Sequence, residues 1–188
     1  MDHRVRVTKQ IIKDALLALM KYKPVSRITV KELCAMAEIS RPTFYQYYMD
    51  VYDLADQVEN EFIQLILSAS GRQPVTSKKE QVNIYKAMCR LYLDNKDLFL
   101  CFYGPNGDPG FTQKIIDSTM SLTSTISEQY VLNYLGSEQA YAIQYLYVGT
   151  FAVIYQWLKK GDTRESIDEI SELMARLSFE GINSKKKR

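Results

Sequence analysis

The side chains best suited to chemistry lie in one short stretch, residues 40–47, which reads Ser-Arg-Pro-Thr-Phe-Tyr-Gln-Tyr. This stretch offers hydroxyls, an amide, a guanidinium and aromatic edges. Such groups bind phosphate oxygens and the edges of bases, which is the chemistry of nucleic-acid recognition. The stretch therefore predicts a surface that binds a nucleotide duplex.

Catalysis and metal binding are not indicated by the remaining residues. The single histidine is His3, and the cysteines Cys34, Cys89 and Cys101 are widely spaced without a C-x-x-C pair. We find no nucleophile beside a base and no glycine-rich loop for phosphates. We therefore expect no enzyme activity, no cofactor, no metal site and no disulfide framework, and we expect the three thiols to be buried.

A helix-turn-helix is expected to position residues 40–47. The first helix has apolar residues at i, i+3, i+4 and i+7, which are Val30, Leu33, Cys34 and Ala37. Thr29 is placed to cap its N-terminus. After the break Glu38-Ile39-Ser40, Ser40 caps a second helix that begins at Arg41 or Pro42, where a proline is tolerated.

On the second helix Phe44 and Tyr48 share one side and are expected to face inward. Pro42, Thr43 and Gln46 then project outward. Such a helix fits the major groove of DNA. Periodicity alone also allows an alternative, which is a polar helix-turn-helix corner without a nucleic-acid partner.

The string Thr43-Phe44-Tyr45-Gln46-Tyr47-Tyr48 resembles the second helix-turn-helix helix of the TetR (tetracycline-repressor-type) transcriptional regulators. The resemblance covers residues 5–55, including a first helix from Thr8 to about Lys21. It implies a DNA-binding set of Thr29, Lys31, Ser40, Arg41, Thr43, Tyr45, Gln46 and Tyr47. Within this set it implies phosphate contacts from Thr29, Tyr45 and Tyr47, and groove contacts from Ser40, Arg41, Thr43 and Gln46.

Two positions depart from that family pattern. The family often has glycine where this chain has Glu38, and usually lysine where this chain has Val51. Glu38 indicates a different turn geometry, and Val51 supplies no charge to a phosphate. Residues 1–60 also resemble the TetR-type proteins found beside dihydroxyacetone kinase genes, although no motif of its own carries this likeness.

Charge is unevenly distributed along the chain. Residues 1–50 hold nine Lys or Arg against five Asp or Glu, a net charge of +4, whereas residues 51–184 hold eleven against seventeen, a net charge of −6. This asymmetry places the attractive field for a polyanion on the N-terminal part. Arg4 and Arg6 are expected to precede the first helix, either as a basic arm or as a disordered start, and the tail 185–188 is basic.

Length and composition indicate one modest globular protein of 188 residues, 46% hydrophobic and 24% charged. No apolar run approaches a membrane span, and the N-terminus has no signal-peptide core, so we expect a cytoplasmic protein without a membrane partner. We expect a DNA-binding domain at 1–50, a helical dimerisation and ligand domain at 51–184, and the tail 185–188.

The chain beyond residue 50 predicts helices and no strands, so the fold class is all-α with about nine helices. The expected helices are 51–70, 77–94, 95–102, 111–134, 137–160 and 163–181, with a loop at 103–110. Leu54, Val58, Phe62, Leu65 and Ile66 are expected to line one side of the first of these helices.

The last two helices carry more apolar surface than one body needs, which predicts a homodimer sealed by these helices; the alternative is that both pack within the monomer. The expected lining of an effector pocket is Phe62, Met88, Tyr92, Phe99, Tyr103, Met120, Tyr147 and Trp157. The same aromatic and methionine residues also suit an ordinary core. An effector would be apolar or aromatic rather than a strong anion.

Three classes of function follow from these patterns. The first is a DNA-binding regulator, a repressor that binds a palindromic operator as a homodimer and is released by a small molecule. The second is a ligand-responsive coactivator whose N-terminal domain docks on another protein. The third, an enzyme, lacks the residues that it needs.

Overall fold

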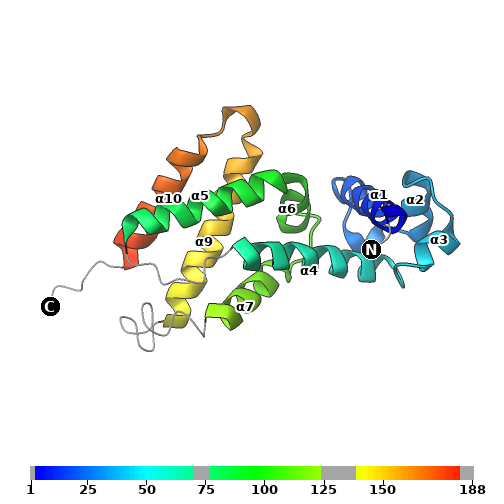
Figure 1. Cartoon of the computed structure of the whole chain (residues 1–188), viewed down its shortest axis with the longest axis horizontal. Helices are drawn as coiled ribbons and strands as arrows, with labels where there is room; N and C mark the ends of the chain where they lie inside the picture. The colour runs from blue at the N-terminus through cyan, green and yellow to red at the C-terminus, as the bar shows by residue number, and fades with distance from the viewer. Residues whose placement is uncertain (1–2, 70–76, 124–138, 183–188) are drawn as a thin grey trace. The chain divides into compact units, whose positions relative to one another are not determined.

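The computed structural model describes residues 3–69, 77–123 and 139–182. Within these ranges the chain forms nine α-helices and two short 3-10 helices, and none of the described residues lies in a strand. Figure 1 shows the helices in chain order by colour. The predicted all-α class is confirmed.

The chain packs into two compact units. The first unit comprises Met1–Phe62 and Asp97–Phe111, and the second comprises Ile63–Lys96 and Thr112–Arg188. We call the first the head unit and the second the body unit. The functional division at residue 50 remains a prediction, because packing divides the chain on a different criterion.

The first part of the head unit contains three α-helices and a 3-10 turn. These are α1 (His3–Met20), η1 (Val25–Arg27), α2 (Val30–Met36) and α3 (Arg41–Tyr45). Helix α2 packs against both α1 and α3. Leu16 of α1, Leu33 of α2 and Phe44 of α3 are all buried, so one apolar core holds the three helices together.

The predicted start of α1 is wrong. The helix begins at His3 instead of Thr8, so Arg4 and Arg6 form part of its first turns and belong to neither a basic arm nor a disordered start. Thr8 does not cap the helix, because its hydroxyl donates a hydrogen bond to the carbonyl of Arg4 at 2.9 Å, one turn back within α1.

Two further helices contribute to the head unit, α4 (Val51–Ala69) and α6 (Lys96–Tyr103). On α4, Leu54, Val58, Phe62 and Ile66 are buried as predicted, but Leu65 is 43% exposed. Ile63, which the sequence did not place on this side, is also buried, so the buried side of α4 is broader than the predicted row and Leu65 lies at its edge. The loop predicted after α6 is confirmed over residues 104–110.

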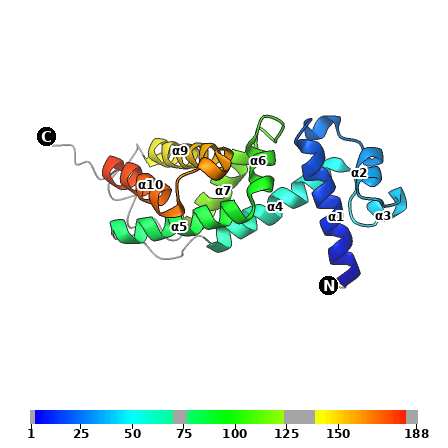
Figure 2. The same ribbon diagram turned by 90° about the horizontal axis from the view of Figure 1, so that it is seen from above.

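The body unit contains most of the remaining helices. These are α5 (Lys78–Asp94), α7 (Phe111–Thr123), α9 (Gln139–Lys159), η4 (Gly161–Thr163) and α10 (Ile167–Ile182). Helix α10 packs along α5 and also contacts α9, as Figures 1 and 2 both show. The capping box predicted between Ser77 and Glu80 is confirmed at the start of α5.

The last helix begins later than predicted. Residues 161–163 form a 3-10 turn, with Gly161 at a φ of +60°. Helix α10 then begins at Ile167, and the Ser166 hydroxyl accepts the Glu169 N–H at 3.2 Å. The predicted parts of the helices at 124–134 and 137–138, and the tail 185–188, lie outside the described residues. Among the helices that are described, none combines the length and the apolar character that crossing a bilayer requires.

A residue other than glycine occupies a left-handed position between α2 and α3. Glu38 has a φ of 53°, which L-residues rarely adopt. The turn is closed by the Ile39 N–H, which donates to the carbonyl of Cys34 at 3.0 Å, as in the Schellman ending of a helix. The sequence predicted a turn geometry different from that of the family's glycine; the structure instead gives Glu38 a positive φ, the conformation that glycine favours at such a turn.

Replacing this residue tests the strain directly. Glu38→Gly should raise the free energy of unfolding of the head unit by about 0.5–1 kcal/mol, because glycine adopts a positive φ without the steric penalty of a Cβ. Ala35→Gly, at an exposed position inside α2, should lower it by a similar amount. Denaturant unfolding measures both, and a destabilised Glu38→Gly variant would contradict the assignment.

Candidate nucleic-acid interface

The N-terminus of α2 is closed by a reciprocal capping box. The Thr29 hydroxyl accepts the Glu32 N–H at 3.3 Å, while the Thr29 N–H and hydroxyl donate to the Glu32 carboxylate at 3.0 and 2.8 Å. The Thr29 hydroxyl proton is therefore engaged within the protein. A phosphate contact from Thr29 would have to compete with the Glu32 carboxylate for this proton.

Glu32 is also paired with a cation from the loop after α1. Lys23 Nζ lies 2.6 Å from Glu32 Oε1. The hydrogen bond from Lys23, followed by those from the Thr29 hydroxyl and N–H, lowers the pKa of Glu32 to about 2. The carboxylate is thus ionised but neutralised, so it does not leave an unpaired negative charge beside Thr29 and Lys31. The sequence analysis identified neither the Lys23–Glu32 ion pair nor the role of Glu32 in the capping box. The capping box could have been found from its Thr-x-x-Glu spacing.

Ser40 caps α3 in the predicted manner. Its hydroxyl accepts the Thr43 N–H at 3.3 Å, and the Ser40 and Thr43 hydroxyl oxygens lie 2.8 Å apart. One hydroxyl donates to the other in this pair, so one proton remains available for an outside acceptor. The two side chains together present one donor and several lone pairs at the start of α3.

Phe44 and Tyr48 face inward, as predicted. Both are buried, and their ring centroids lie 5.7 Å apart. Lys9 of α1 lies over the Tyr48 ring, with Nζ 5.6 Å from its centroid. Burial, with the nearby carboxylates of Glu61 and Asp53, raises the pKa of Tyr48 to about 12. Tyr48 is therefore a neutral structural anchor on the inner side of the segment.

The opposite side of this segment faces solvent. Tyr45 is 56% exposed and packs edge-on against Phe44, with ring centroids 5.5 Å apart. Ser40, Arg41 and Gln46 are exposed, and Thr43 and Tyr47 are partly exposed. Thr29 and Lys31 are exposed at the start of α2, which packs against α3. Every residue of the predicted DNA-binding set therefore has solvent access within the head unit, and whether each contacts DNA remains a prediction.

The start of α4 departs from the family pattern in a definite way. Val51 is buried, so its side chain is not available to a phosphate. Met49 and Tyr52, on either side of the Asp50–Val51 pair, are both largely exposed. Sequence reasoning missed these two residues, because a break between short helices gives no periodicity from which exposure can be predicted.

The residues predicted to line an effector pocket are divided between the two units. In the head unit Phe99 lies 6.4 Å from Phe62 and 5.2 Å from Tyr103 between ring centroids. In the body unit Tyr92 and Tyr147 both pack against Phe151, at 6.2 and 6.1 Å.

The other three residues of the predicted lining are Met88, Met120 and Trp157. Met88 is partly buried on α5. The Trp157 indole N–H donates to the carbonyl of Glu165 at 2.7 Å, which assigns this side chain a structural bond. The side chain of Met120 lies outside the described part. The pocket itself remains a prediction.

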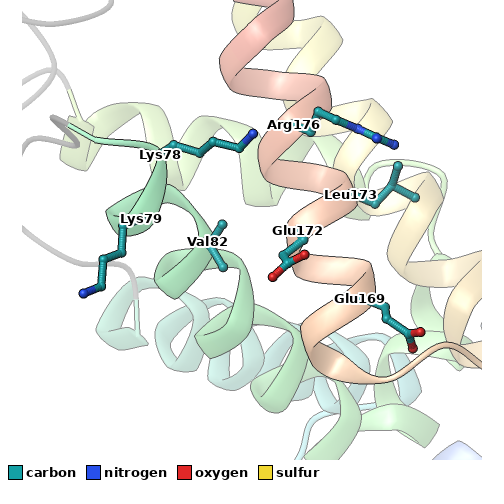
Figure 3. A pocket seen from close by; sticks show the side chains of 7 residues that line it. All are labelled: Lys78, Lys79, Val82, Glu169, Glu172, Leu173 and Arg176. Atoms are coloured by element: carbon teal, nitrogen blue, oxygen red, sulfur yellow. The ribbon is translucent and has the colours of Figure 1, made fainter.

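Two hollows in the described surface have other linings. The larger is an open groove of about 690 Å³ between α5 and α10, lined by Lys78, Lys79, Val82, Glu169, Glu172, Leu173 and Arg176. Figure 3 shows Lys78 reaching toward α10 while Lys79 points away. The smaller, of about 120 Å³, lies in the head unit beside Lys9 and Tyr48. Neither is bordered by the predicted effector residues. Among the described residues, no group of His, Cys, Asp and Glu could hold a metal ion.

A family model described as the C-terminal region of a transcriptional regulator, TetR_C_8, matches residues 79–180, more than half of the chain. The chain belongs to the TetR family of transcriptional regulators. The family resemblance predicted from residues 5–55 is confirmed by a match to a different part of the chain. Family membership also confirms that the protein is a regulator rather than an enzyme.

Individual proteins agree with this assignment. The chain is 40% identical over 47 residues to the uncharacterized HTH-type transcriptional regulator YxbF of Bacillus subtilis (strain 168), a match that spans 25% of this chain and 12% of that protein.

Two solved structures share the fold. The dihydroxyacetone kinase operon activator DhaS superposes with a TM-score of 0.58 at 19% identity, and a TetR-like transcriptional regulator from Rhodococcus sp. RHA1 with a TM-score of 0.65 at 18% identity. Each comparison covers 95% of this chain and 97% of the other.

The pKa of Glu32 gives a test of the capping box in this TetR-family head unit. A carboxyl whose pKa is lowered by folding stabilises the folded state above its ordinary value of 4.5, and that stabilisation is lost as the pH falls toward about 2. NMR titration of the Glu32 carboxyl should give a midpoint of about 2, and Lys23→Met should move the midpoint upward. An ordinary midpoint in the unmodified protein would contradict the pairing.

Proposed function

We propose that this TetR-family regulator binds double-stranded DNA through the outer side of α3, with α2 contributing Thr29 and Lys31. The observation that carries the proposal is the division of residues 40–48. Phe44 and Tyr48 are buried, whereas Arg41, Tyr45 and Gln46 are exposed. A short helix anchored by its apolar side presents its polar side to a groove.

Charge supports the same surface. Residues 1–50 carry a net charge of +4, and the Glu32 carboxylate within them is paired with Lys23. Arg41 supplies a planar guanidinium that suits a guanine edge or a phosphate, and Gln46 supplies an amide that suits adenine. The Ser40–Thr43 hydroxyl pair and the Tyr45 phenol suit phosphate oxygens. We also propose that the protein acts in the cytoplasm, because its proposed partner is DNA.

We further propose that the regulator is a homodimer, joined through α9 and α10. Tyr141 and Tyr145 of α9 are 79% and 74% exposed, Val148 is also exposed, and so is Leu177 of α10. Gly149 lies beside Val148, and a Cβ added to it would meet no atom within 4 Å. A row of apolar side chains beside an open glycine suits the close approach of a second helix.

A two-fold dimer presents two copies of α3 to a palindromic operator, with half-sites about 34–36 Å apart. The proposed mode of control is repression of nearby genes, relieved by an effector that binds one spacing of the two heads better than the other. The effector is proposed to be apolar or aromatic, because the residues proposed to line its pocket are aromatic or methionine and none of them carries a charge. If the protein is a repressor, deleting its gene should raise transcription of the neighbouring genes.

Selection of genomic fragments with the purified protein tests DNA binding most directly. A duplex with two related half-sites should be recovered, and binding should weaken steeply with salt. The absence of any complex that resists competitor DNA would overturn the proposal. Binding to another protein in place of DNA would instead support the coactivator alternative.

Replacing single tyrosines of the protein by phenylalanine and measuring binding to the selected duplex tests individual contacts. Tyr45→Phe should lower affinity about fivefold, because one phosphate hydrogen bond contributes about 1 kcal/mol. Tyr22→Phe is the matched control, since Tyr22 is 85% exposed in the same unit and lies outside α2 and α3. Fluorescence anisotropy measures both dissociation constants. Equal affinities of Tyr45→Phe and the unmodified protein would remove Tyr45 from the interface.

Charge placed on α9 tests the dimer. Tyr145→Glu should give a monomer without unfolding the chain, because the Tyr145 side chain is exposed and a buried pair of carboxylates at a two-fold interface is unfavourable. Tyr22→Glu should leave the oligomeric state unchanged. Light scattering coupled to gel filtration gives the mass of each variant, and a monomeric unmodified protein would contradict the interface.

A further inference from the structure

The C-terminal end of α1 is closed by a side chain from a distant part of the sequence. The last carbonyls of a helix lack partners within it. Asn106, in the loop after α6, donates from Nδ2 to the carbonyl of Met20 at 3.1 Å, and lies 3.5 Å from the carbonyl of Lys21. An amide 86 residues away thus performs the task that a neighbouring residue usually performs.

Two more contacts join the same segment to α1 and to Lys21, the residue after it. The Cys101 thiol donates to the carbonyl of Leu17 at 3.4 Å, one turn before Met20. Lys21 Nζ lies 3.3 Å from Asp97 Oδ2, in an exposed pair of small energetic weight. We call residues 97–107 the α6 clasp. These contacts reach the last turn of α1 and Lys21 directly after it, and the bonds from Cys101 and Asn106 are partly buried.

The clasp is held in shape by its own packing. A Cβ on Gly107 would lie 1.8 Å from the carbonyl oxygen of Phe102, so no larger residue fits without moving the loop. The Gly107 N–H donates to the carbonyl of Gly104 at 3.0 Å. Phe102 packs against Phe111 at 5.6 Å between ring centroids. The backbone that carries Asn106 is therefore fixed to α6.

The clasp belongs to the region matched by the family model, residues 79–180, yet it packs in the head unit. The chain enters it from α5 and leaves it into α7, and nearly all residues of these two helices belong to the body unit. The clasp is thus the part of the C-terminal region that holds α1. Helix α1 in turn packs against α2, and α2 packs against α3.

We infer that Asn106 is a positioning residue for DNA binding. By closing the end of α1, the α6 clasp fixes the helix on which α2 and α3 are oriented. The inference rests on the proposed function, because its consequence is the affinity for a duplex. A change at either end of the clasp reaches the DNA-binding helices through these bonds to Leu17, Met20 and Lys21.

Variants of Asn106 test the inference on the duplex recovered by selection. Asn106→Ala should lower affinity about fivefold. Asn106→Asp should lower it further, because a carboxylate would lie against the negative end of α1. Asn95→Ala is the matched control. Asn95 Nδ2 donates to the carbonyl of Leu91 at 2.9 Å, the same kind of bond at the end of α5, without touching α1.

Affinity is measured well below the thermal transition, where a loss of stability alone leaves the folded fraction unchanged. In the free protein, the amides at the end of α1 should exchange faster in Asn106→Ala than in the unmodified protein. Their exchange rates should be unchanged in Asn95→Ala. Unchanged affinity and exchange in both Asn106 variants overturns the inference, as does an equal loss of affinity in Asn95→Ala. Failure of the unmodified protein to bind any duplex overturns the proposed function instead, and exchange at α1 then decides whether the clasp holds the helix.

A surface variant covers the case in which the Asn106 variants do not fold. Asp97→Lys adds a positive charge, which by itself strengthens attraction to DNA. It also replaces the negative partner of Lys21 by a positive charge, and the repulsion between the two side chains should loosen the clasp. A loss of affinity despite the added positive charge supports the clasp, and an unchanged or raised affinity overturns it.

Discussion

The burial of Phe44 is the constraint on which the proposed DNA-binding surface depends. Helix α3 has five residues, too few to be stable alone in water. It persists because Phe44 is buried between its neighbours, with Tyr48 beside it, and because Ser40 closes its first turn. Fixing this inner side leaves Arg41, Tyr45 and Gln46 no direction but outward. The recognition surface is therefore a consequence of core packing, and its precision is set by how firmly α1 and α2 hold the same core.

Polar bonds at helix ends complete the head unit. Thr29 and Glu32 close the start of α2, Glu38 ends it in a left-handed conformation, and Asn106 closes the end of α1. Each bond satisfies a backbone group that its helix leaves open. The bond from Asn106 differs from the others because it comes from residues 79–180, the region matched by the model of a transcriptional regulator C-terminal region. This bond joins the C-terminal region directly to α1 of the head unit.

Local features of the fold could be predicted from the sequence, because caps and apolar spacing act within a few residues. The caps at Thr29, Ser40 and Ser77 and the burial of Phe44 and Tyr48 were predicted in this way and are confirmed, although α3 ends at Tyr45, before Tyr48. Features that depend on distant packing could not be predicted. Leu65 is exposed whereas Ile63 is buried, and α1 extends back to His3, five residues before the start at Thr8 that the resemblance implied. The bond from Asn106 to Met20 has no sequence signal at all.

The central claim is that the outer side of residues 40–47 contacts a nucleotide duplex, and amide NMR during titration with the selected duplex tests it most directly. The largest amide shifts should occur at residues 29–31 and 40–47. The chemical shifts of the buried Phe44 ring should stay the same. Shifts confined to the body unit, or none at these residues while a complex forms, would contradict it.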